Sequence, residues 1–238
     1  MNNTSLVLLE NTKLKKLEEY KLDETNISEF RSRIKQVDDE TKKELGKELF
    51  DLISSKKKST RKDEEFTNKV FELIINGADI EYKDEKKGDF ALLVCTRKGF
   101  IEIAYLLLRA GANVNQVNNY LTTTLMAAAR HGHKELVELL ILLGANVNAK
   151  CLDGDNALMS AKRHNQQACF DILVHSQASL THRNNTNQTI IDLEGKVSLN
   201  PNYLIGANKT EETSPITEED VSKLLEEAEE QLHRLQNK

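Results

Sequence analysis

The apolar and polar positions between residues 77 and 181 follow a pattern that recurs at a fixed interval. Each copy has a short segment of small and apolar residues, a turn, a longer apolar segment, and then Gly-Ala-Asn-Val-Asn or a close variant. The closing positions are Gly77, Gly111, Gly144 and, in the last copy, Gln177, so the steps are 34, 33 and 33 residues. A fixed period of this length is typical of solenoids, in which each unit packs only against its neighbours.

Each copy predicts two helices and an extended segment. In the clearest copy, Leu125 to Arg130 is a short Ala-rich helix, and Gly132 permits the left-handed conformation that ends it. The segment from Leu136 to Leu143 is apolar on most of its circumference, as expected for a helix packed on several sides. Because the short helices carry small residues and the long ones carry leucines, we expect a curved stack with the short helices and extended fingers on its concave face.

The stretch TTTLMAAARHGHKELVELLILLGANVNAK, residues 122–150, resembles the ankyrin-repeat consensus T-P-L-H-x-A-A-x-x-G-H followed by L-L-x-x-G-A-D-V-N. The resemblance extends over about residues 45–195 and implies an all-α solenoid of about four to five helix-turn-helix repeats with β-turn fingers. The consensus Pro and His are replaced by Ala91 and Leu93, by Thr124 and Met126, and by Ala157 and Met159. These losses remove a favourable helix start and an inter-loop hydrogen bond, so we expect lower stability with no change of fold.

Both flanks differ from the repeats. Residues 1–44 predict a helical capping region, in which Asn26 and Glu29 form a capping-box pair before a helical apolar pattern that ends at Val37. We expect that helix to pack on the open side of the first repeat. The first repeat carries a basic loop, KKKSTRK, which is either a solvated loop or a nuclear import patch. Residues 196–215 predict a linker, and residues 216–238 an acidic amphipathic helix.

Composition and charge exclude several classes of function. With 5% aromatic residues and no Trp, the 238-residue chain does not suggest a large enzyme domain. A net charge of −5 does not suggest a nucleic-acid binder, and no apolar run approaches the roughly 18 residues that a membrane span needs. The first residues lack the layout of a secretory signal, so a cytoplasmic location is expected.

The candidate chemistry is sparse, and we expect neither a cofactor nor a metal. The three cysteines lack C-x-x-C spacing and are interpreted as free thiols. His131 and His133 flank Gly132 without a third ligand at coordinating spacing. Ser160 and His164 lie one helical turn apart without an orienting group or an oxyanion donor. These patterns predict a protein that is not an enzyme.

The residues that vary on the concave side are the candidate binding positions. By the ankyrin pattern, the two residues before each inner turn are Arg97 and Lys98, Arg130 and His131, and Arg163 and His164. Stacked helices lie roughly 8 to 10 Å apart, so the three arginines would form a ladder. The finger positions Val117, Tyr120, Leu121 and Leu152 carry apolar or aromatic side chains where the family usually has Asp and Gly, which is typical of interface anchors. The finger residues that we include in the site are Val117, Asn119, Tyr120 and Leu152. The alternative is that basic residues are simply common at the ladder position and that Tyr120 folds back onto its neighbour.

The resemblance implies a non-catalytic module that binds another protein in the concave groove and at the finger tips. The basic ladder favours a partner with an acidic or mixed-charge segment, and we expect a monomer. Two other hypotheses stay open. The glutamate-rich end of the chain is similar to the translocation signals of type IV secreted bacterial effectors, which would make the partner a host protein. Residues 211–230 carry nine acidic residues against Lys223 alone, so this tail could instead occupy the groove and block it.

Overall fold

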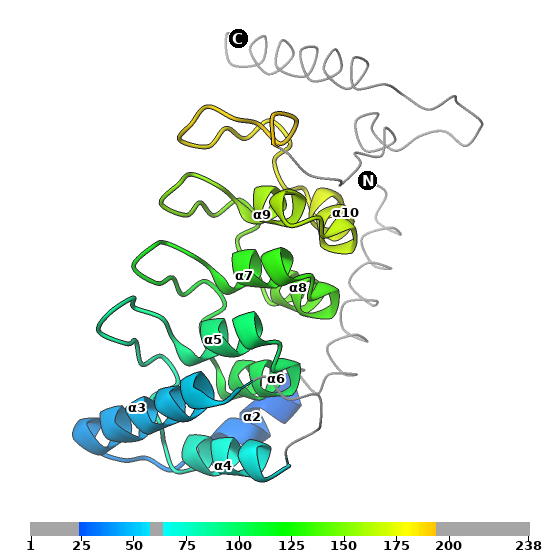
Figure 1. Ribbon diagram of the computed structural model, residues 1–238. Coiled ribbons are helices and arrows are strands. Elements are labelled where there is room, and N and C mark those ends of the chain that lie inside the picture. The colour runs from blue at the N-terminus through cyan, green and yellow to red at the C-terminus, as the bar shows by residue number, and fades with distance from the viewer. Residues whose placement is uncertain (1–23, 58–63, 194–238) are drawn as a thin grey trace, which may run out of the picture.

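A column of paired helices makes up the part of the chain that the computed structural model describes, residues 24–57 and 64–193. Figure 1 shows four pairs stacked on one another, with the fingers projecting from the same side. The pairs are α3 (Asp39–Ser55) with α4 (Glu64–Ile75), α5 (Ala91–Lys98) with α6 (Ile101–Ala110), α7 (Thr124–His131) with α8 (Lys134–Leu142), and α9 (Ala157–Arg163) with α10 (Gln167–His175). Within these ranges there are isolated bridges but no strands, so the predicted all-α solenoid is confirmed.

The helices form an inner row and an outer row. The inner helices α3, α5, α7 and α9 contact one another in sequence, and the outer helices pack behind them. Ala127, Ala128 and Ala129 of α7 are almost completely buried, since their small side chains let α5 and α9 approach on either side. Leu136, Leu139 and Leu140 of α8 are also buried, and one apolar core runs through the described stack. The bulk difference that the sequence predicts between the rows is present.

Side-chain caps start two of the inner helices where the consensus proline is missing. Thr123 and Asn156 each accept a hydrogen bond from the backbone N–H three residues later, at 3.1 and 2.9 Å. Phe90 stands before α5 without such a bond. A cap of this kind contributes about 1 kcal/mol to helix stability. The missing prolines are therefore partly compensated in α7 and α9.

Three fingers connect the pairs, at residues 77–90, 111–123 and 144–156, and a fourth follows the last pair at residues 177–189. A side chain in each of the first three accepts a hydrogen bond from a backbone N–H of the next finger. The bonds run from the N–H of Asn113 to Glu81, of Asn146 to Asn115, and of Ser179 to Asn148, at 2.6, 2.8 and 2.9 Å. Burial raises the pKa of Glu81, and the hydrogen bond from Asn113 opposes that effect. These bonds fix each unit against the next.

Helix α2 (Glu24–Ser32) crosses the outer row of the first two pairs. Its buried Phe30 packs edge to face with Phe71 of α4, with the two ring centroids 5.9 Å apart. The guanidinium carbon of Arg109 in α6 lies 4.9 Å from the centroid of the Phe30 ring. The expected position on the open side of the first repeat is therefore wrong, because α4 and α6 together offer Phe30 an aromatic and a cationic neighbour. Asn26 lies inside the described part of this helix, so the predicted capping box does not start it.

Several sequence predictions lie outside the described residues. They concern residues 1–23, most of the basic loop, the linker at 196–215 and the acidic helix at 216–238. The boundary predicted between residues 44 and 45 falls inside α3, which begins at Asp39. The described part of the chain contains four helix pairs and ends at Leu193, shortly after the fourth finger, so a fifth repeat stays a prediction.

Candidate partner-binding surface

Arg97, in the last turn of α5, forms an ion pair with a carboxylate of the same chain. Arg97 Nη1 donates to Asp89 Oδ2 at 2.6 Å, and the Asp89 side chain is only 10% exposed. The amide of Asn118, in the second finger, donates to Asp89 Oδ1 at 2.7 Å. Asp89 is thus buried between Arg97 and Asn118.

The arginine that ends α9 has the same arrangement two units later. Arg163 Nε donates to Asp155 Oδ2 at 2.8 Å, and Asn184 Nδ2 donates to Asp155 Oδ1 at 2.8 Å. A further bond runs from Arg163 Nη2 to Gln188 at 3.2 Å. In both units, an aspartate eight residues before the arginine accepts one hydrogen bond from the guanidinium and another from the side-chain amide of an asparagine in the next finger.

The middle unit lacks both partners. Thr122 stands 33 residues after Asp89, and Cys151 stands 33 residues after Asn118. Arg130 is exposed, and no carboxylate among the described residues forms an ion pair with it. The three arginines thus occupy equivalent positions of the inner helices, but they are not equivalent in charge. Among the described residues, Arg97 and Arg163 are neutralised by aspartates, and Arg130 has no such partner.

His131 and His164 extend the surface around Arg130. Burial lowers the pKa of His131, and the nearby side chains of His133 and Arg130 lower it further. The rings of His131 and His133 stack with their centroids 6.1 Å apart. His164 is exposed, and its Nδ1 lies 3.0 Å from the backbone oxygen of Ser160. The hydroxyl of Ser160 donates to a different backbone oxygen, so Ser160 and His164 form no nucleophile–base pair.

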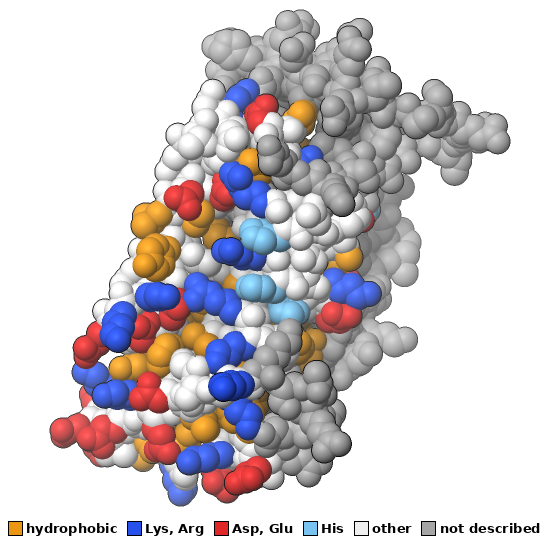
Figure 2. Space-filling model, in the orientation of Figure 1, with side chains coloured by type: hydrophobic (Ala, Val, Ile, Leu, Met, Phe, Trp, Pro, Cys, Tyr) orange, Lys and Arg blue, Asp and Glu red, His pale blue; other side chains and the backbone are white. Residues whose placement is uncertain are grey.

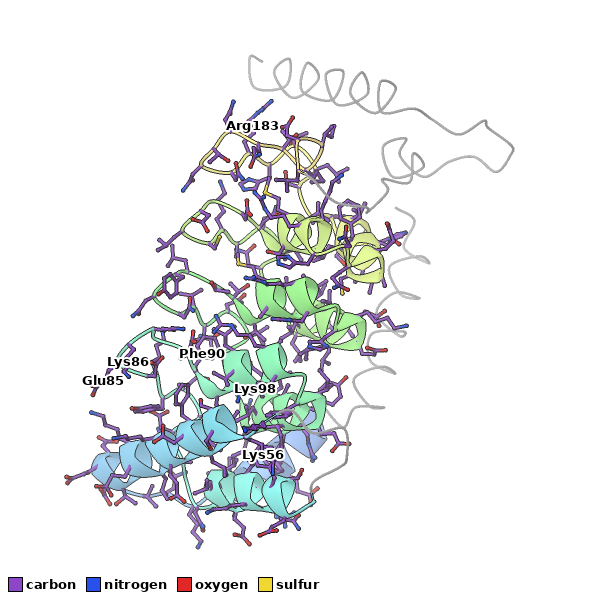
Figure 3. All side chains as sticks on the ribbon, viewed as in Figure 1. Lys56, Glu85, Lys86, Phe90, Lys98 and Arg183 are labelled. Carbon is purple, nitrogen blue, oxygen red and sulfur yellow. The ribbon has the colours of Figure 1, made fainter. Side chains whose placement is uncertain are left out.

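Lys98 occupies a different place from the other ladder residues. Its ammonium donates to the backbone oxygens of Ser54 and Lys56, at 2.6 and 2.7 Å, and so caps the C-terminal end of α3. Figure 3 labels Lys98 and Lys56 on either side of that helix end. Burial lowers the pKa of Lys98. Its role in the described structure is to join α5 to α3, and we leave it out of the binding surface.

The finger tips carry the exposed large hydrophobic side chains of the described chain. They are Tyr120, Leu121 and Leu152, with 51%, 43% and 53% of their surface exposed. The N–H of Leu152 donates to the carbonyl of Tyr120 at 3.0 Å, which joins the second finger to the third. With about half of its surface exposed, Tyr120 is not buried against its neighbour. Figure 2 shows hydrophobic side chains at these tips, on the same face as the histidines and basic side chains of the inner helices.

The other two predicted finger residues lie on the same finger. Val117 is half-buried, and its carbonyl accepts a hydrogen bond from the ammonium of Lys83 at 2.6 Å. Asn119 is exposed, and its backbone N–H donates to the carbonyl of Lys87 at 2.9 Å. Both residues flank the exposed tip.

Leu121 has a backbone conformation that leucine seldom adopts. Its φ is +55°, in the left-handed region, and its counterparts at 33-residue steps are Gly88, Gly154 and Asn187, with φ of +63°, +81° and +62°. Glycine and asparagine tolerate this region, whereas it costs other residues about 1 to 2 kcal/mol. The apolar side chain of Leu121 stands out in the sequence, and the register with Gly88 and Gly154 adds that its backbone conformation is unfavourable for leucine.

The described residues offer little for catalysis. They contain no group of three or more His, Cys, Asp or Glu side chains that could hold a metal ion. Burial raises the pKa of Cys169 to about 11 and raises that of Cys95 further, so neither thiol ionises near neutral pH. Within the same residues, no helix combines the length and the apolar character that crossing a membrane would require.

Comparison with known proteins identifies the repeats. A family model described as ankyrin repeats, in three copies, matches residues 62–151 and 122–184, which together span just over half of the chain. No curated protein matches the chain. Ankyrin repeats are generally protein–protein interaction modules and are typically non-catalytic. The stacked helix pairs, the fingers and this match together establish that the chain belongs to the ankyrin-repeat family.

Proposed function

We propose that the chain binds a partner protein through one continuous surface around the second and third fingers. The surface consists of Tyr120, Leu121 and Leu152 at the finger tips and of Arg130, His131 and His164 on the inner helices, with Val117 and Asn119 at its edge. The observation that carries this proposal is the gathering of the exposed large hydrophobic side chains at two adjacent tips. Tyrosine and arginine are the residue types enriched at the energetic centres of protein interfaces.

Leu121 supports the proposal independently. A leucine at φ +55° costs stability, and the side chain is 43% exposed, so burial recovers only part of that cost. The neighbouring fingers avoid the cost with Gly88 and Gly154. Strained residues that persist in a fold concentrate at functional sites, and a leucine here gains its full apolar burial only when another molecule covers it.

The charged part of the surface is smaller than a three-arginine ladder. Asp89 and Asp155 neutralise Arg97 and Arg163, which leaves Arg130 as the centre of positive charge, with His131 and His164 beside it. This charge favours a partner with an acidic or mixed-charge segment. A monomeric state stays a prediction. The type IV effector and self-blocking hypotheses also stay predictions, because the acidic segment on which both depend lies outside the described residues.

Affinity capture from a lysate of the source organism or its host, read by mass spectrometry, tests the surface. The test variant is Tyr120→Ala with Leu152→Ala, which removes both exposed anchors. The matched control is Glu85→Ala with Lys86→Ala, two exposed residues at the tip of the first finger (Figure 3). We expect a partner retained by the wild type and the control, and captured roughly tenfold less by the folded test variant. Equal retention by the test variant would reject this surface.

A further inference from the structure

We propose that the partner presents a carboxylate to Arg130, so that the surface recognises a segment in which an Asp or Glu side chain lies next to apolar side chains. This inference rests on the proposed function, and it specifies the chemistry of the partner. It comes from the comparison of Arg130 with the other two arginines of the same position.

The units on either side of Arg130 show how the arginine at this position is bound when an aspartate and an asparagine are both present. In each, one aspartate carboxylate accepts from the guanidinium through one oxygen and from an asparagine amide of the next finger through the other. The distances from the carboxylate are 2.6 and 2.7 Å around Asp89, and both are 2.8 Å around Asp155. A carboxylate with two such donors is held by charge-assisted hydrogen bonds, which are stronger than neutral ones.

Both protein partners are replaced together in the middle unit. If Thr122 alone had replaced the aspartate, an asparagine at position 151 would be left with an amide that has no acceptor. The side chain of Cys151 has no amide group, so the free chain carries no unsatisfied amide donor there, and the exposed Arg130 is solvated by water. The paired replacement thus leaves a stable surface on which the guanidinium is available to a carboxylate from outside.

The position of this guanidinium explains why the acidic side chain must have apolar neighbours. Thr122 directly follows Leu121, and Cys151 directly precedes Leu152. By analogy with Arg97 and Asp89, Arg130 lies next to the finger segment that carries Leu121, so a carboxylate that binds Arg130 from outside would approach it near the exposed tips. Apolar side chains on either side of it would cover Tyr120, Leu121 and Leu152 and would exclude water from the ion pair, which strengthens it.

The surrounding charges favour an acidic peptide over a nucleic acid. A nucleic-acid surface needs several cations in a row, each contacting a phosphate. Here the arginines on both sides of Arg130 are already paired with Asp89 and Asp155, and the pKa of His131 is lowered, which keeps that side chain neutral at neutral pH. Among the residues of the proposed surface, Arg130 is therefore the one strong cation, and it lies near the apolar tips.

A single substitution can close the site from within. Thr122→Asp places a carboxylate eight residues before Arg130, the spacing at which Asp89 and Asp155 bind their arginines. The folded variant keeps Arg130 and all three apolar anchors. Thr122→Asn is the matched control, because it has nearly the same shape as the aspartate and no charge. Arg130→Gln removes the cation directly.

The probe is a display library of random peptides, selected on the full chain and read by sequencing. We expect enriched peptides with an Asp or Glu next to apolar residues. A synthetic copy of one of them should bind roughly tenfold or more weakly to Thr122→Asp and to Arg130→Gln, and with unchanged affinity to Thr122→Asn. The copy with its acidic residue replaced by the corresponding amide should lose affinity for the wild type to the same extent.

The outcomes separate this inference from the proposed function. Selected peptides that bind equally to Thr122→Asp but lose affinity for the Tyr120→Ala, Leu152→Ala variant would overturn the carboxylate and keep the surface. Peptides that bind that double variant undiminished would overturn both. Enrichment of basic peptides, or no enrichment above an unrelated protein, would also overturn the inference.

Discussion

Asp89 should contribute more to stability than any exposed finger residue. Asp89→Ala removes the acceptor of two hydrogen bonds, one from Arg97 at 2.6 Å and one from Asn118 at 2.7 Å. Asn118 is only 3% exposed, so its amide would lose its acceptor away from water. A hydrogen bond to a charged group contributes about 1.5 to 3 kcal/mol, and an unsatisfied buried donor costs about 1 to 3 kcal/mol.

The Arg97 side chain is one-third exposed, which lets water replace part of what it loses. We therefore place the loss at about 2 to 3 kcal/mol, near the lower end of what breaking a fully buried pair costs. For a domain of this size, the loss corresponds to a decrease in Tm of roughly 5 to 10 °C. Urea unfolding followed by far-UV circular dichroism measures it.

Asp153→Ala is the matched control for this experiment. It removes the same charge from an exposed position of the third finger, and a surface change of this kind stays within about 0.5 kcal/mol. If Asp89→Ala and Asp153→Ala had the same free energy of unfolding, the account of Asp89 as a buried link between Arg97 and the second finger would be wrong.

Three further predictions follow from the fold. Gly46→Ala should destabilise the protein by about 1 to 3 kcal/mol, although alanine is the better helix former. The added Cβ would lie 2.7 Å from both the Cβ and the carbonyl oxygen of Asp79. A free energy of unfolding in urea that is higher than that of the wild type would contradict this. Lys98→Met should cost about 1 to 2 kcal/mol and speed hydrogen exchange at the end of α3, and unchanged exchange there would refute the cap. The lowered pKa of His131 means that the unfolded chain binds a proton more readily than the folded one, so the free energy of unfolding should decrease as the pH drops below about 6.5. His131→Gln should weaken that pH dependence. Identical profiles of unfolding free energy against pH for the wild type and the variant would exclude this role of His131.

The repeat architecture could be predicted from the sequence because stacking requires the same sizes and turns in every unit. The 33-residue register of the apolar positions and turn glycines located the helix pairs and the fingers. The same register could also have revealed the difference among the arginines, since Asp89, Thr122 and Asp155 occupy one column of the repeat. The arginines alone do not show that difference, because it lies in the residues eight positions before them.

Other features depend on contacts that no periodic pattern contains. Lys98 caps α3 because that helix has 17 residues, whereas α5, α7 and α9 have seven or eight, so only Lys98 has a helix end within reach. The position of α2 depends on the contacts that Phe30 makes with Phe71 and Arg109. Both cases are tertiary contacts between segments that lie far apart in the chain.

The backbone bonds between finger tips have a consequence for the kinetics of binding. The N–H groups of Asn119, Leu152 and Asn185 each donate to a carbonyl of the preceding finger, at 2.9 to 3.0 Å. The tips are therefore already ordered before a partner arrives, and little conformational entropy of the fingers remains to be lost on association. Binding should then be a single concentration-dependent step without a slow rearrangement of this chain, and differences in affinity between partners should arise mainly from their dissociation rates.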